Sequence, residues 1–80
     1  MEEWIDAAPG AVGEGALRPE EVTILLRLAR EVAHRTERRM APLAAFLAGA
    51  AAGRASPEDR LTALRAAAAA LERLLPGDPA

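Results

Sequence analysis

The 80-residue chain contains no cysteine, and its single histidine is His34. The absence of cysteine excludes both disulfides and thiolate metal sites, and one histidine cannot build a zinc site alone. A chain of this length buries only about 60% of the surface that its unfolded form exposes, which leaves its stability marginal. Because disulfides and a structural metal are missing, oligomerisation is the most economical source of further stability.

Lysine, asparagine and glutamine are also absent, and all ten basic residues are arginines. The lack of thermolabile amides fits a thermophile, although a GC-rich genome would give the same bias. Twelve acidic residues bring the net charge to −2. A general nucleic-acid binder would carry a basic surplus, so the charge balance argues against nucleic acid as a partner.

Long hydrophobic runs are missing too. The longest uncharged segment, 40–53, has 14 residues, whereas a membrane-spanning helix requires about 20. The chain starts with the acidic sequence MEEWID and lacks the basic region of a signal peptide. We therefore expect a cytoplasmic protein without a membrane partner.

Strand-forming residues are scarce and never alternate with polar ones, whereas alanine, the best helix former, occurs 21 times. We expect an all-α fold, a small helical bundle that forms one domain over residues 1–80. Prolines suited to helix starts and the apolar spacing place three main helices and a short N-terminal one. The expected bounds are about 2–8 for the short helix and about 19–38, 41–53 and 57–75 for the others. Residues 9–18, with Pro9 and three glycines, are predicted to be a loop, and residues 78–80 to fray.

Segment 40–53 has no polar side chain, and a helix that is apolar on every side is normally buried in a core or an interface. We place its larger residues in the core together with apolar residues of the neighbouring helices. The predicted core is Leu25, Val32, Leu43, Phe46, Leu47, Leu64 and Leu71. Trp4 is expected to cover one end of it.

Small residues line the opposite side of the same segment, in a row formed by Ala45, Gly49 and Gly53. Glycine inside a helix costs roughly 1 kcal/mol relative to alanine, so Gly49 favours a close helix crossing. The alternative is a chance run of alanines with a glycine cap at Gly53. Because an 80-residue monomer cannot cover every face of this helix, we expect a homodimer with a two-fold interface. The candidate interface residues are Ile24, Leu28, Ala45, Gly49 and Gly53.

One polar sector of the second helix carries Arg27, Arg30, His34 and Arg38. Arginine binds phosphate oxygens through two N–H groups, and histidine can titrate nearby, so the sector is a candidate anion-binding site. The alternative, which we favour, is a solvated face. Acidic residues such as Glu31 lie at helical spacing from these arginines, and no glycine-rich loop adjoins them.

Residues suited to catalysis or metal binding are few. Glu31 and His34 resemble one Glu-x-x-His pair of a di-iron bundle, but the third helix offers no acid to complete a site, so we predict no metal and no cofactor. Ser56, the only serine, suits a helix cap, and the chain has neither a P-loop nor a dinucleotide fingerprint. We predict no catalytic residues and expect that the protein is not an enzyme.

Two segments carry a family resemblance, LAREVAH at 28–34 and APLAAFLAGAAAG at 41–53. With Trp4–Ala7 and the rest of Leu25–Arg54, they resemble a small family of uncharacterised helical domains common in actinobacteria. These domains occur alone or attached to molybdenum-cofactor guanylyltransferases, which make molybdopterin-guanine dinucleotide. The resemblance implies a context near molybdenum-cofactor assembly, and it carries no catalytic residues to this chain. The family has a longer first helix where this chain has Pro9 and three glycines.

Two hypotheses follow from these observations. The first is a helical interaction module that forms a homodimer or docks on a protein of the molybdenum-cofactor pathway. Its basis is apolar surface in excess of what 80 residues can hide. The second is a binder of a phosphorylated small molecule that uses the arginine and histidine sector of the second helix.

Overall fold

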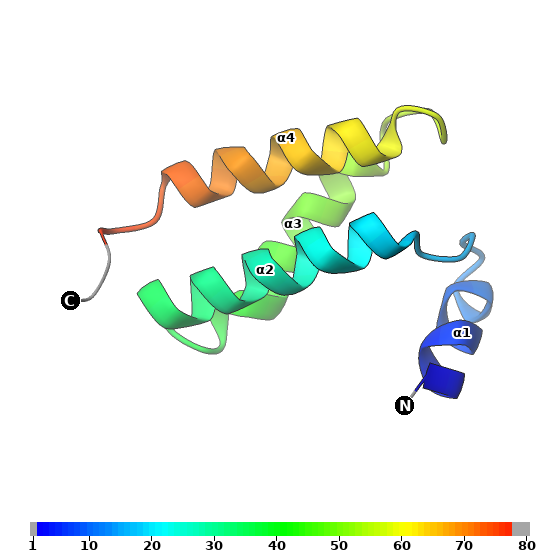
Figure 1. Ribbon diagram of the computed structural model, residues 1–80, viewed down its shortest axis with the longest axis horizontal. Helices are drawn as coiled ribbons and strands as arrows, with labels where there is room; N and C mark the ends of the chain where they lie inside the picture. Colours follow the sequence, from blue (N-terminus) through cyan, green and yellow to red (C-terminus); the bar gives the residue numbers. More distant parts are fainter. Residues whose placement is uncertain (1, 78–80) are drawn as a thin grey trace.

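The computed structural model describes residues 2–77 and contains four helices over that range, with no strand. The helices are α1 (Glu2–Ala11), α2 (Pro19–Arg35), α3 (Met40–Ala52) and α4 (Arg60–Arg73). Figure 1 shows their order along the chain. The predicted all-α fold is confirmed. The fraying expected for 78–80 lies outside the described residues.

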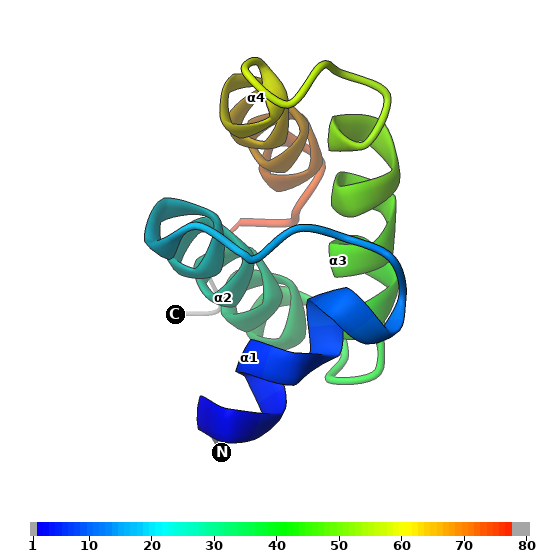
Figure 2. The ribbon, with the colours of Figure 1, turned by 90° about the vertical axis from the view of Figure 1, so that its right-hand side faces the viewer.

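Three of the helices pack together. α2 and α4 lie side by side and run in the same direction, and α3 crosses behind them and runs back (Figure 1). Seen from the side, the three helices form a triangle, with α1 outside it (Figure 2). α1 packs against none of the other three helices. The parallel course of α2 and α4 brings their N-termini together at one end of the bundle.

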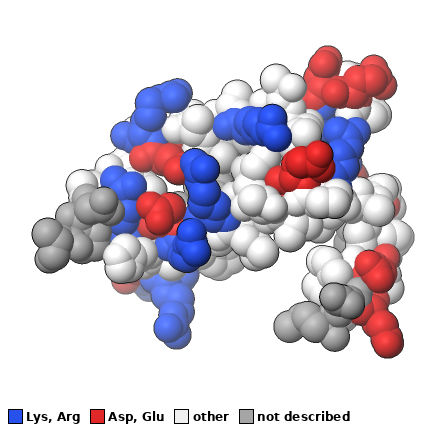
Figure 3. Space-filling view, in the orientation of Figure 1, with Lys and Arg blue, Asp and Glu red and all other residues white. Residues whose placement is uncertain are grey.

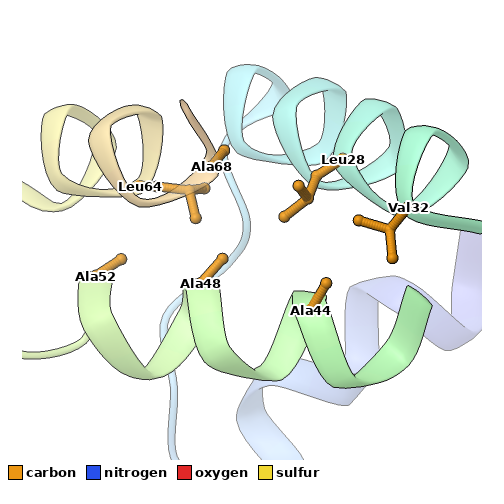
Figure 4. Close-up of a cluster of buried hydrophobic side chains, with 7 residues drawn as sticks. All are labelled: Leu28, Val32, Ala44, Ala48, Ala52, Leu64 and Ala68. Carbon is orange, nitrogen blue, oxygen red and sulfur yellow. The ribbon is translucent and has the colours of Figure 1, made fainter. Parts of the chain in front are cut away.

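The core is formed by one face of each packed helix (Figure 4). Its buried members are Leu28, Val32, Ala44, Ala48, Ala52, Leu64 and Ala68. α3 contributes only alanines, which allow α2 and α4 to approach its backbone closely. Leu25 and Leu71 are partly buried and pack against this cluster. The predictions for Val32 and Leu64 are confirmed.

Three large side chains of α3 point away from the core, contrary to the prediction, whereas Met40 packs against it. Phe46 is 73% exposed, Leu43 57% and Leu47 56%. Because α3 is apolar on all sides, its sequence period carries no information about which face is buried. The bundle buries the small face, and the large residues lie outside it. Trp4 is 69% exposed, so it does not cover an end of the core either.

The first helix is longer than the predicted 2–8, and the loop is correspondingly shorter than 9–18. α1 continues through Pro9 to Ala11. Gly13, two residues after the helix, has a φ of 77°, which is easily reached only without a side chain. The N–H of Gly13 donates to Gly10 O over 3.1 Å, and that of Glu14 donates to Pro9 O over 2.8 Å. These two bonds are the usual C-terminal motif of a helix that ends in a left-handed glycine.

The other boundaries differ by about one turn or less. α2 ends at Arg35, where both the N–H and the hydroxyl of Thr36 donate to Val32 O. α4 begins at Arg60, after a turn in which Ser56 Oγ donates to Asp59 Oδ2 over 3.1 Å. No helix among residues 2–77 is long and apolar enough to cross a membrane.

A candidate interaction surface beside α1 and α3

A groove of about 620 Å³ opens between α1 and the three-helix bundle. Trp4 and Ile5 of α1 line one side of it, and Leu17, from the loop after α1, also contributes. All three side chains are exposed, Trp4 most of all. The groove is therefore lined mainly by apolar groups that are in contact with solvent.

The bundle side of the groove is formed partly by glycine. Gly49 and Gly53 of α3 line it together with Leu25 and Leu64. A side chain at Gly49 would meet no atom within 4 Å of its Cβ, whereas one at Gly53 would lie 3.2 Å from Gly49 O. The missing side chain at Gly49 thus leaves room in the groove.

Glu21 and Arg60 form an ion pair that also lines the groove. Arg60 Nε lies 2.6 Å from Glu21 Oε2, and Arg60 Nη2 lies 2.8 Å from Oε1. The Glu21 side chain is 3% exposed and that of Arg60 24%. Such a two-pronged contact is the strongest geometry between arginine and a carboxylate. It joins the N-terminal ends of α2 and α4.

Glu21 is satisfied by further contacts in the same place. Its Oε1 accepts a hydrogen bond of 2.8 Å from the backbone N–H of Arg18, which precedes α2. The hydrogen bonds from Arg60 lower the pKa of the Glu21 carboxyl below its ordinary 4.5, against the opposing effect of burial. The carboxylate in turn raises the pKa of Arg60. Arg18 also bonds to Pro57 O over 2.8 Å, a second link between the starts of α2 and α4.

The sequence analysis missed this ion pair. Acids in the first turn of a helix are common because they interact favourably with the helix dipole, so Glu21 drew no attention. Arg60 was the residue that could have indicated the pair, since a basic residue at a helix start opposes that dipole and requires a nearby acid. The partner lies 39 residues away, and only the packing of α2 against α4 identifies it.

Next to the groove lies the outer face of α3, which we define as Leu43, Phe46, Leu47 and Ala50. All four residues are exposed. Residues three and seven apart lie on the same side of a helix. Phe46 therefore shares a side of α3 with Gly49 and Gly53, which line the groove, so the predicted placement of these glycines opposite Phe46 was wrong. On α3 the outer face thus adjoins the glycine side of the groove.

The predicted interface residues lie in three different places. Gly49 and Gly53 line the groove, and Ala45 is half-buried. Ile24 is half-buried and packs against the core. Leu28 is 0% exposed at the centre of the chain's own core, so its assignment to an interface was wrong. The helical stripe of α2 predicts that Leu28 is buried, but it does not say whether the chain's own core or a second chain buries it.

Arg27, Arg30 and His34 of the predicted anion sector lie on α2, whereas Arg38 lies in the turn after it, because α2 ends at Arg35. α2 and α4 present arginines and acids interleaved with one another (Figure 3). Arg27 Nη2 lies 3.2 Å from Glu72 Oε2 of α4. Arg30, His34 and Arg38 are exposed. The structure thus engages one of the four residues with an acid of the neighbouring helix.

Glu31, which stands at Glu-x-x-His spacing from His34, pairs with an arginine of its own helix. Glu31 Oε1 lies 3.6 Å from Arg35 Nη1, one turn along α2. Across the part of the chain that the structure describes, no group of three or more potential metal-ligating side chains comes together. Arg35 also donates two hydrogen bonds to Pro76 O, which ties the end of α2 to the segment after α4.

Comparisons with known proteins give one match. Neither the curated proteins nor the solved structures contain a significant relative. One family, described as Domain of unknown function (DUF6457), matches residues 1–80. Because this match covers the whole of the four-helix chain described above, the chain belongs to the DUF6457 family.

Proposed function

We propose that this chain is a cytoplasmic, non-enzymatic interaction module that forms a homodimer through the outer face of α3. One observation carries the proposal: α3 buries its alanines and exposes Leu43, Phe46 and Leu47. Single exposed apolar residues are common, but a contiguous apolar patch marks an interaction site. Aromatic residues such as Phe46 are also enriched among the residues that dominate interface energies.

A second copy of the chain suits this face because the face carries no charge. In a two-fold contact a charge close to the symmetry axis lies opposite its own copy and is repelled by it. α3 has no charged side chain between Met40 and Ala52. Two such helices in contact therefore bury apolar surface without electrostatic repulsion.

Light scattering after size-exclusion chromatography tests the homodimer. The wild-type chain should elute as a dimer at micromolar concentration, and Phe46→Glu should weaken the dimer roughly 30-fold, because a charge enters the interface twice. Leu74→Glu is the matched control, since Leu74 is 81% exposed at the far end of α4. A monomeric wild type, or equal effects of the two substitutions, would refute the proposal.

We further propose that the partner in the cell is a guanylyltransferase of the molybdenum-cofactor pathway. The support is the resemblance of 28–34 and 41–53 to domains attached to such enzymes. Co-elution of the purified chain with the purified guanylyltransferase of the same host tests this proposal. The complex should form with wild-type chain and survive Arg30→Ala, which lies on the α2 sector. Separate elution at tens of micromolar would contradict it.

A further inference from the structure

We propose that each copy in the homodimer inserts its Phe46 into the groove of the other copy. Groove and outer face would then form one self-complementary interface rather than two separate surfaces. This inference rests on the proposed homodimer and specifies what covers the groove. It differs from a contact between two outer faces alone, because Trp4 and Gly49 become part of the interface.

The first argument is the placement of a protruding side chain beside a hollow. Phe46 is 73% exposed, and Gly49, on the same side of α3, leaves open space above its Cα. A two-fold axis exchanges the two features: when Phe46 of one copy faces the other copy's groove, the reverse contact forms as well. A surface that carries both features in adjacent positions can therefore close on itself.

The second argument is the chemistry of the groove. Three charged residues line the groove, and two of them, Glu21 and Arg60, bind each other at 2.6 and 2.8 Å. Glu14 is the third. The remaining lining is mostly apolar, and its volume of about 620 Å³ exceeds the needs of one phenyl ring. An aromatic side chain accompanied by neighbouring leucines fits such a space.

The third argument is charge complementarity around the apolar centre. α1 and the loop after it carry acids, including Asp6 and Glu14, and no basic residue precedes Arg18. Figure 3 shows only acidic charge over α1. The outer face of α3 is flanked by exposed arginines, Arg54 after it and Arg39 before it, and Arg39 Nε also lies 3.4 Å from Glu37 Oε1. Docking Phe46 beside α1 of the other copy would bring arginines toward acids, which orients the partners.

Surface area supports the same arrangement. Aromatic side chains bury about 150–250 Å² each, and a two-fold interface contains two copies of Phe46 and two of Trp4. Stable interfaces generally bury more than about 1,000 Å². The outer face alone supplies one aromatic per copy, whereas insertion into the groove adds Trp4 and Ile5 and brings the interface nearer to this size.

Trp4 provides a direct test because it is the only tryptophan in the chain. It is exposed in the monomer, so dimerisation by insertion should shift its emission to shorter wavelength and protect it from acrylamide. Both signals should follow the monomer–dimer curve measured by light scattering on the same samples. Phe46→Ser should remove the concentration dependence of both.

Gly49→Leu tests the groove itself. A leucine side chain at this position meets no atom near its Cβ, so the monomer should fold, but the side chain occupies the space that Phe46 of the partner would enter. We expect the dissociation constant to rise at least about tenfold. Gly49→Ala is the control, because it also favours the helix yet fills little of the groove. Circular dichroism verifies folding of both variants.

Two outcomes would overturn the inference and are distinguishable. A dimer that forms with unchanged Trp4 emission and is unaffected by Gly49→Leu would leave the homodimer standing and exclude insertion into the groove. A wild type that stays monomeric at all accessible concentrations would remove both the homodimer and the inference.

Discussion

The two sides of this small bundle differ in the kind of side chain that they present. Between α2 and α4, two ion pairs join charged groups within the chain, Glu21 with Arg60 and Arg27 with Glu72. On the side formed by α1 and α3, large apolar groups lie exposed. The first side pairs charged groups within one chain, whereas the second exposes the apolar groups that the proposed homodimer would cover. We therefore expect substitutions on the first side to affect folding stability and substitutions on the second to affect the proposed association.

The two ion pairs between α2 and α4 also differ from each other in burial. At the N-terminal ends of α2 and α4 the ion pair is buried and accepts a further backbone hydrogen bond at Glu21. Nearer the C-terminal ends, Arg27 is 65% exposed and its pair with Glu72 faces solvent. Buried and exposed pairs differ strongly in what their removal costs.

Arg60→Ala should have the largest effect on folding. It leaves the buried carboxylate of Glu21 without its partner, which typically costs about 3–5 kcal/mol in the free energy of unfolding. Urea denaturation measures the loss, and Arg60→Lys should fall between the wild type and Arg60→Ala. Arg27→Ala, at the exposed pair, should cost below about 1 kcal/mol. Similar losses from Arg60→Ala and Arg27→Ala would remove the distinction between the two ends.

Ala48→Leu should have the next largest effect. Ala48 is 0% exposed and faces the space between Leu28 and Leu64 (Figure 4), so added methyl groups overfill the core. Such overpacking typically costs about 1–3 kcal/mol. Ala50→Leu, on the outer face, should leave unfolding of the monomer nearly unchanged when both are measured by chemical denaturation at submicromolar concentration. A larger loss from Ala50→Leu would invert the assignment of the two faces.

Acidification should have the third largest effect, because it weakens the buried ion pair of Glu21 and Arg60. The pKa of Glu21 is lowered in the folded state, chiefly by hydrogen bonds from Arg60. Its contribution is therefore fully present above the ordinary value of 4.5 and is lost as the pH falls through the lower folded value. The difference in unfolding free energy between wild type and Glu21→Gln should shrink below pH 4.5. A difference that stays constant from pH 7 to pH 2.5 would contradict the shift.

Phe46→Ala should barely change the stability of the monomer. A buried phenylalanine would lose about 3–5 kcal/mol on this substitution, but Phe46 is 73% exposed, and changes at such surface sites generally stay within about 0.5 kcal/mol. Urea denaturation at submicromolar concentration gives the monomer value. A loss above about 2 kcal/mol would place Phe46 back in the core.

The smallest effect is expected on the anion sector. Pyrophosphate at millimolar concentration should leave the melting temperature of the wild type unchanged, because Arg27 is engaged by Glu72 and the rest of the sector is exposed to solvent. Thermal denaturation of wild type and Arg30→Ala side by side measures this. Stabilisation that depends on Arg30 would revive the phosphorylated-ligand hypothesis.

The helices themselves were predictable from the sequence, because proline at a start and a 3.6-residue apolar period are local signals. Val32 and Leu64 were correctly assigned to the core, since each lies on the single apolar stripe of an amphipathic helix. The same reasoning failed on α3, which has no polar face to orient it. The prediction for α3 therefore relied on side-chain size and placed its large residues in the core. The bundle instead buries the alanine face, which permits the neighbouring helices to approach closely.

The candidate site was less predictable than the fold. Gly49 and Gly53 were identified as special from their small size, and both line the groove. The opposite side of the groove depends on α1, which continues through Pro9 although a proline inside a helix normally predicts an end. The pairing of Glu21 with Arg60 depends on two helices that are distant in sequence, so no local pattern contains it.

The alanine row of α3 has a consequence for conformational entropy. Alanine loses no side-chain rotamer freedom on burial, whereas each leucine loses about 0.5–1 kcal/mol. Because the buried residues of α3 are Ala44, Ala48 and Ala52, and Met40 is its one long side chain packed against the core, folding orders few side-chain torsions on that helix. The exposed side chains of Leu43, Phe46 and Leu47 keep their torsional freedom in the monomer and would lose it only in the proposed homodimer. In that arrangement the conformational entropy of α3 would be lost in two steps, one for each face of the helix.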